Sequence, residues 1–201
     1  MTFPAFFDDV PAIRVHDGLA RLLGTAADGV ITYRYADAVR LAGHSCPTVA
    51  GAWLSARAGF RALYGDDLPQ RGGVRVSLPD TEDAGVTGVI GQVMTLVTGA
   101  AGAGGFKGLG GLHARKDLLR YGDTSAGALR MRRMDTGETV EVTFDASPVP
   151  ADPEMRVMIP LALAGGMEAV ARFGAAWQER VRRLLIEHAD DPAVVSVRPV
   201  A

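Results

Sequence analysis

The side chains best suited to chemistry lie in one short segment, Gly43–Thr48, which reads Gly-His-Ser-Cys-Pro-Thr and contains the chain's only cysteine. Proline is favoured at the first position of a helix, because the N–H that it lacks would have no partner there. If Pro47 opens a helix, Cys46 occupies the cap position and faces the positive end of the helix dipole, which favours the thiolate. The segment therefore predicts a reactive or metal-binding sulfur.

His44 lies two residues before Cys46, and an imidazole nitrogen and a thiolate sulfur both suit zinc. The pair supplies only part of a coordination shell. His16, His113, a carboxylate, water, a substrate atom or a second subunit would have to complete it. An open position is what a catalytic metal requires, so we expect His44 and Cys46 to form a zinc site.

The same residues admit other interpretations. Cys46 is the nucleophile of a metal-free thiol enzyme if His44 acts as its base. Alternatively, Cys46 is a small buried hydrophobe and His44 a capping side chain. In a further alternative, the chain is a non-catalytic accessory or assembly subunit that docks through its last helix. Whether the chain is an enzyme stays open at this point.

A second candidate is the tract Gly99–Gly111, which has seven glycines in thirteen residues and includes Lys107. Glycines let backbone N–H groups approach an anion, and the lysine adds charge. The tract matches neither the phosphate-binding loop nor the dinucleotide pattern, which excludes a standard nucleotide site. We expect Lys107, Gly105 and Thr48 to contact a small-molecule ligand. The alternative is a flexible or closely packed loop.

Composition narrows the function classes. The chain has 201 residues, a formal net charge of −2 and one cysteine. One cysteine excludes an internal disulfide framework and any four-cysteine metal site. The charge gives no basic footprint for nucleic acid. The sequence lacks a long uninterrupted apolar run, and Met1–Val10 lacks the features of a secretory signal, so we expect a cytoplasmic protein without a membrane span.

Hydrophobic periodicity and turn residues predict a mixed chain, irregular at residues 1–14. The predicted helices are Gly18–Leu23 (capped by Asp17), Ala36–Ala42, Pro47–Tyr64, Gly85–Thr98 and the amphipathic Gly166–Ala189. The predicted strands are Gly29–Tyr35, Gly72–Leu78 and a hairpin of Leu129–Met134 with Thr139–Phe144. Residues 157–163 fit a strand or a short helix. This order predicts an α+β fold with 1–150 as its core and 151–201 as an extension of the same domain.

The segment Gly43–Pro47, followed by a small-residue helix with Gly51, resembles the FmdE family of formylmethanofuran dehydrogenase subunits. The tract Thr98–Leu109 with Lys107 and the hairpin turn at Asp135–Glu138 are also similar, so the resemblance covers about residues 15–145. It implies a mixed sheet packed by helices, similar to the catalytic domain of glyceraldehyde-3-phosphate dehydrogenase. It also implies a homodimer and a cleft at His44 and Cys46.

This sequence departs from that family at several positions. Ala42 stands where members often have a further histidine, and Ala100 and Ala101 stand where they often have a cysteine. Many relatives carry a C-terminal zinc finger with paired cysteines, which this chain lacks. The resemblance suggests a link to one-carbon or molybdenum/tungsten enzyme systems, and it does not imply the formylmethanofuran reaction itself.

Overall fold

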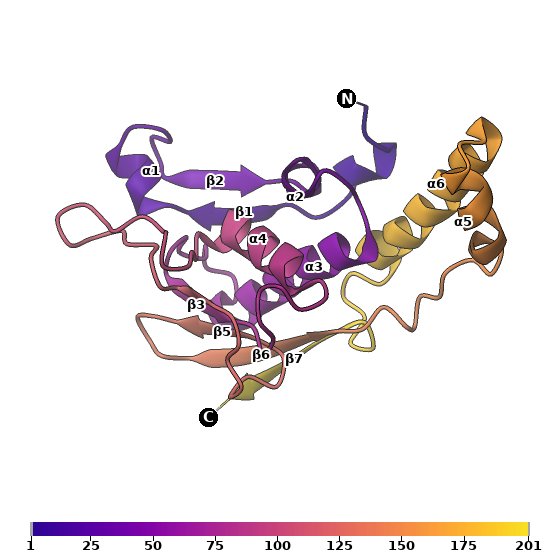
Figure 1. The fold of residues 1–201 in the computed structure, drawn as a ribbon. Coiled ribbons are helices and arrows are strands. Elements are labelled where there is room, and N and C mark those ends of the chain that lie inside the picture. The colour runs from indigo at the N-terminus through magenta and orange to yellow at the C-terminus, as the bar shows by residue number, and fades with distance from the viewer. Residues whose placement is uncertain (1, 201) are drawn as a thin grey trace.

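The computed structural model describes residues 2–200, which form three layers (Figure 1). A two-stranded ribbon lies on one side, the helices α3 and α4 lie in the middle, and a five-stranded sheet lies on the other side. The helices are α1 (Gly18–Leu22), α2 (Tyr35–Ala42), α3 (Pro47–Tyr64), α4 (Thr87–Thr98), α5 (Met155–Leu163) and α6 (Met167–Arg182). A 3-10 turn covers Ala5–Asp8, and a π-helical turn, Arg183–Glu187, follows α6.

The large sheet mixes parallel and antiparallel pairs, and its strand order is β4-β3-β5-β6-β7. Only β3 and β4 pair in parallel. The strands of the molecule are β1 (Ile13–His16), β2 (Val30–Tyr33), β3 (Val74–Ser77), β4 (Leu119–Arg120), β5 (Leu129–Arg133), β6 (Thr139–Phe144) and β7 (Val195–Val200). The predicted α+β class with a mixed sheet is confirmed, as is the β5–β6 hairpin.

Helix α3 is the centre of the fold, and its predicted limits agree with the structure. Pro47 occupies the first turn, and Gly65 ends the helix with a φ of 59°. The helix packs on the sheet through Gly51 and Gly59, since a Cβ at Gly59 would lie 2.2 Å from Sδ of Met131. The small residues let the backbone of α3 approach the strands closely. Trp53 on the same helix is fully buried.

Asp17, directly after β1, links three segments of the chain. Its carboxylate caps α1 by accepting the N–H groups of Leu19 and Ala20. It also pairs with Arg71 at 3.1 Å and with Arg115 at 2.8 Å. Burial alone would raise the pKa of Asp17, but the Ala20 N–H, the Arg71 hydrogen bond and the two positive charges together lower it. The predicted cap is confirmed, and it is part of a buried ion cluster.

Several segments differ from the sequence-based expectation. Residues 1–14 are expected to be irregular, but Ile13 and Arg14 belong to β1, which pairs with β2. Residues 155–163 form a helix with Pro160 inside it, which decides the strand-or-helix alternative. The amphipathic last helix is shorter than predicted, because α6 gives way to the π-helical turn at Arg183. Strand β7 was not predicted, and it joins the core sheet beside β6.

Helices α5 and α6 form a hairpin that extends away from the sheet (Figure 1). Its apolar side chains are exposed: Leu163 is 84% accessible, Met167 87% and Val157 69%. Further along α6 and its π-helical turn, Val181 and Leu184 are fully buried against the core. The apolar side chains of this segment are therefore buried near its C-terminal end and exposed at the turn between α5 and α6. Within residues 2–200, no helix has both the length and the apolarity that a bilayer crossing requires.

Candidate functional site

The turn between α2 and α3 has the geometry that its sequence suggests. Gly43 ends α2 with a φ of 76°, a left-handed conformation that glycine adopts without strain. The chain then passes through His44 and Ser45 to Cys46, which is the cap residue of α3. The Sγ atom of Cys46 accepts the N–H of Val49 at 3.5 Å. The predicted position of Cys46 at the helix start is therefore confirmed.

The sulfur of Cys46 lies in the core. Its residue is only 8% exposed, and it belongs to the buried cluster around Tyr35 and Trp53. Helix α6 packs over the turn, because Trp177 Nε1 donates to the carbonyl oxygen of Ser45 at 2.9 Å. The Tyr35 hydroxyl lies 3.0 Å from Ser45 Oγ, and burial raises the pKa of Tyr35. These contacts join the turn to α2 and α6.

His44 is exposed, and its ring is oriented by its own turn. Nδ1 lies 2.9 Å from the carbonyl oxygen of Ala42, which can only accept, so Nδ1 carries the proton. Nε2 then has a free lone pair. A backbone carbonyl on the other ring nitrogen is the usual arrangement for a histidine that binds a metal.

A complete metal shell is not assembled here. Among residues 2–200, no group of three His, Cys, Asp or Glu side chains is placed to hold an ion. His16 Nδ1 is engaged with Gln70 Oε1 at 2.9 Å, and the ring of His113 packs against Gly18 at the start of α1. Zinc binding by His44 and Cys46 therefore stays a prediction.

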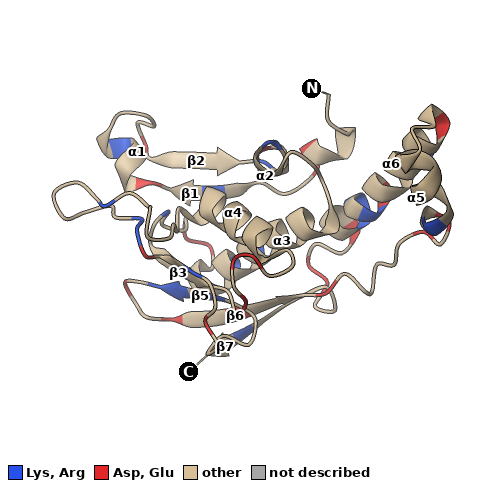
Figure 2. Ribbon diagram, viewed as in Figure 1, with Lys and Arg blue, Asp and Glu red and all other residues tan. Residues whose placement is uncertain are grey.

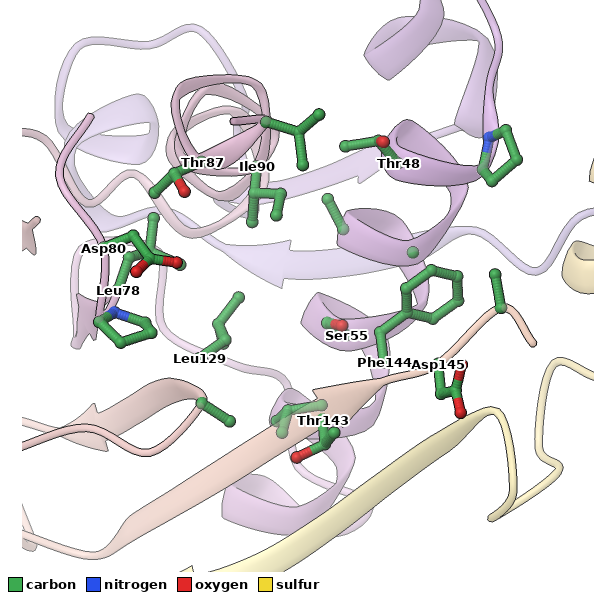
Figure 3. Close-up of a pocket in the computed structure, with 18 residues that line it drawn as sticks. Thr48, Ser55, Leu78, Asp80, Thr87, Ile90, Leu129, Thr143, Phe144 and Asp145 are labelled. Carbon is green, nitrogen blue, oxygen red and sulfur yellow. The ribbon is translucent and has the colours of Figure 1, made fainter. Parts of the chain in front are cut away.

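A cleft of about 460 Å³ opens beside the first turns of α3 (Figure 3). Thr48 and Ser55 line it from α3, Thr87 and Ile90 from α4, and Phe144 from the end of β6. The remaining lining residues are Pro47, Gly51, Ala52, Leu78, Pro79, Asp80, Val86, Ala128, Leu129, Val142, Thr143, Asp145 and Ala146. The walls are mainly apolar, with a few hydroxyl groups set among them.

Two carboxylates lie at the edges of this cleft. Asp80 follows β3, and Asp145 follows β6; both are exposed. The N–H and hydroxyl of Ser147 hydrogen-bond to Asp145 and lower its pKa. The cleft therefore has an apolar interior, three hydroxyl groups on the helices (Thr48, Ser55 and Thr87) and negative charge at its rim. Such an arrangement suits a ligand with an apolar body and a hydrogen-bond-donating end.

The predicted ligand-binding residues do not come together. Thr48 lines the cleft, whereas Gly105 lines a separate open groove of about 850 Å³ between the glycine tract and α4. Lys107 is exposed and lines neither. Arg71 also lines the groove, but its guanidinium is already bonded to Asp17 and to the carbonyl of Leu96. Thr48 and Gly105 therefore line different cavities, and ligand contacts by Thr48, Gly105 and Lys107 stay a prediction.

Sequence reasoning missed most of the cleft. Thr48 and Ser55 are seven residues apart, two helical turns, with Gly51 and Ala52 between them on the same face of α3. This stripe of small and hydroxyl residues is a local signal that could have identified Ser55. Asp80 and Thr87 reach the cleft only through the packing of α4 and the β3 end against α3.

The comparisons with protein families and with curated proteins do not assign this chain to a family. No protein-family model matches this chain, and no curated protein matches it.

Proposed function

We propose that this protein binds a small molecule with an apolar body and a hydroxyl or amine end in the cleft beside α3. The observation that carries the proposal is the convergence of Thr48, Ser55 and Thr87 on one mainly apolar cavity of about 460 Å³. Cavities of this size, apolar with a few placed polar groups, are the usual form of small-molecule sites. The carboxylates of Asp80 and Asp145 favour a donor or a cation at the rim and disfavour an anion.

A matched pair of probes tests this proposal. Phenethylamine and 3-phenylpropionate share an aromatic body and carry opposite charges at similar positions. Each is titrated into the full-length protein and followed by ligand-observed NMR. The amine should bind, and the acid should bind at least about tenfold more weakly, since the rim carries carboxylates. Equal binding of the acid, or no binding of either probe, would contradict the proposed ligand class.

A substitution that fills the cleft tests whether the ligand binds there. Thr48→Phe puts a ring at the rim of the cleft on the first turn of α3, where Thr48 is only half-buried. Thr32→Phe puts the same ring on an exposed position of β2 and serves as the control. The first variant should lose binding and the second should keep it, provided that both retain the wild-type circular dichroism spectrum.

Zinc binding through His44 and Cys46 is the second candidate. The observation that favours it is the Nδ1 contact to the Ala42 carbonyl, which leaves Nε2 of His44 free to bind a metal. Zinc content is measured on freshly purified wild type, His44→Ala and Cys46→Ser. Stoichiometric zinc that is lost in both variants supports this candidate, and zinc that is absent or unchanged removes it. The metal-free thiol enzyme has less support, because Cys46 is 8% exposed and does not line the cleft.

The turn entering α3 and the mixed sheet support the further proposal that the chain belongs to the FmdE family of formylmethanofuran dehydrogenase subunits. The proposal includes a fold similar to the catalytic domain of glyceraldehyde-3-phosphate dehydrogenase and a cytoplasmic location. It also includes a homodimer formed through the α5–α6 hairpin. The exposed Leu163 and Met167 support that contact, since large uncovered apolar side chains mark interaction surfaces. An accessory role without chemistry would use the same hairpin.

A further inference from the structure

The five-stranded sheet is covered by helices on one face only (Figure 1). Side chains alternate between the two faces of a strand. Val74 and Val76 of β3 and Met131 of β5 are buried on the face toward α3. Arg75 lies between the two valines and Arg132 directly follows Met131. Both arginines therefore point to the other face of the sheet. Figure 2 shows basic positions on β3, β5 and β7.

Some of the basic residues on this open face are neutralised by the protein itself. Glu141 on β6 is 1% exposed and accepts hydrogen bonds from Arg130 and Arg198 on its two neighbouring strands. Its pKa is lowered, first by the hydrogen bond from Arg130. Arg130 also bonds to Ser125, which covers that end of the face. In this part of the sheet one carboxylate is shared by two arginines, so both guanidinium groups already have a partner within the protein.

Three arginines at the other side of the face have no such partner. Arg75, Arg120 and Arg132 make no ion pair and donate no side-chain hydrogen bond within the described part of the chain. Arg120 and Arg132 are exposed. The Nε atom of Arg75 is buried and has no hydrogen-bond partner among the described residues. A buried donor without an acceptor is unfavourable, so nothing inside the protein compensates Arg75 Nε.

The three side chains lie on adjacent strands. Arg75 is directly opposite Arg132 in the β3–β5 register. Arg120 is on β4, on the other side of β3, where its register partner is Ser77, two residues from Arg75. Neighbouring strands are about 4.8 Å apart, so the three guanidinium groups share one small area. Burial lowers the pKa of Arg75 first, and the positive charges of Arg120 and Arg132 lower it further. Like charges directly opposite each other destabilise a sheet, so this arrangement favours an external anion.

The surroundings of the cluster limit what that anion is. The central residues of the open face are Arg, Ser, Thr and Glu, with no aromatic side chain on which a base could stack. They also supply no apolar centre of the kind that protein interfaces use. The ligand class that fits these surroundings is a compact, multiply charged anion. Arginine guanidinium groups bind phosphate through two parallel hydrogen bonds.

We propose that Arg75, Arg120 and Arg132 form a site for a free oligophosphate, an anion that carries several linked phosphate groups. This site is separate from the cleft beside α3, whose rim is acidic. Its three guanidinium groups supply the charge, and Arg75 lies between the other two in the strand order. The proposal therefore goes beyond the proposed function of the cleft.

Calorimetric titration of the full-length protein with sodium tripolyphosphate at low ionic strength tests the site. The probe should bind wild type, and Arg120→Gln and Arg132→Gln should each weaken binding by about tenfold. Arg21→Gln removes one charge from an exposed position on α1 and should change the affinity by about twofold or less. Absence of binding to wild type, or an equal loss in Arg21→Gln, would overturn the site.

Two further measurements separate this site from its alternatives. Without the anion, Arg132→Gln should leave the melting temperature unchanged or raise it, because the substitution relieves repulsion with Arg75. A clear fall would assign Arg132 a structural role and count against the site. A uridylate dodecamer should bind more weakly than tripolyphosphate. Tighter binding of the RNA would identify the face as a nucleic-acid surface and contradict a free oligophosphate ligand.

Discussion

Gly51 on α3 lies directly against the ring of Phe144 at the end of β6, and a Cβ at Gly51 would stand 2.4 Å from the ring atom Cδ1. Both residues line the cleft beside α3. The absence of a side chain at Gly51 therefore sets two properties at once: how closely the helix approaches the sheet and how wide the end of the cleft is.

The first prediction concerns this contact. Gly51→Ala should destabilise the protein by about 1–3 kcal/mol, because the added methyl group displaces the Phe144 ring. Urea unfolding measures the change. Gly174→Ala on α6 is the control, since nothing outside the backbone of its own helix lies within 4 Å of its would-be Cβ, and it should stabilise by about 0.5–1 kcal/mol. Equal effects of the two substitutions would show that the close approach at Gly51 has no energetic weight.

The second prediction concerns Asp17 and its dependence on pH. Asp17→Asn leaves Arg115 buried without its counter-charge, so it should cost about 3–5 kcal/mol near neutral pH. The folded-state pKa of Asp17 is lowered, so its contribution is fully present above the unfolded-state pKa of about 3.9. The contribution is lost as the pH falls through the lower folded-state value.

Melting temperatures measured from neutral pH down to about pH 3 test this dependence, because the difference between wild type and Asp17→Asn should shrink on acidification. Asp190→Asn is the control: its carboxylate pairs with Arg57 but is 63% exposed, so the effect should stay below about 1 kcal/mol. A difference between wild type and Asp17→Asn that stays constant with pH would contradict the ion pairs as its source.

The third prediction separates the capping role of Cys46 from its chemistry. Serine caps helices well and alanine does not, so Cys46→Ser should be more stable than Cys46→Ala by about 1 kcal/mol. Thermal unfolding of the two variants measures this difference. Iodoacetamide should modify Cys46 slowly in the native protein and quickly in urea, because the residue is 8% exposed. Fast alkylation of Cys46 in the native protein would contradict its burial and favour the interpretation of the chain as a thiol enzyme.

The fourth prediction concerns the α5–α6 hairpin. Met167→Glu places a charge on a side chain that is 87% exposed, so the monomer should lose no stability from it. Light scattering should show a dimer for wild type and a monomer for the variant. Glu168→Gln, one residue away and also exposed, should remain a dimer. A wild-type protein that is monomeric at all accessible concentrations would exclude the homodimer.

Local signals explain which elements could be predicted from the sequence. Pro47 and Gly65 mark both ends of α3, and the alternation around Val74 and Val76 identifies β3. Strand β4 has two residues and is defined by its pairing with β3, so no local sequence pattern predicts it. Strand β7 contains Pro199, a residue that argues against a strand, and is tolerated because β7 is at the edge of the sheet.

The candidate site shows the same division. The turn with His44 and Cys46 is contiguous in sequence, so its position at a helix start could be predicted. The burial of Cys46 is only one of the alternatives that the sequence leaves open, because it depends on contacts from distant elements such as Trp177, which packs over the turn. The cleft joins Thr48 with Asp80, Thr87 and Phe144, which come from four separate segments. The composition of the glycine tract predicts a ligand-binding loop. In the structure Gly102, Gly104 and Gly105 line a groove that is separate from the cleft beside α3.

The most direct test of the central claim is to locate a bound ligand by amide chemical-shift mapping with phenethylamine. We predict shifts confined to the cleft, at Thr48, Ser55 and Thr87 and at the end of β6. Shifts at Gly102–Gly105 in the other groove, with the amides around Thr48 unchanged, would contradict the assignment of the cleft as the binding site.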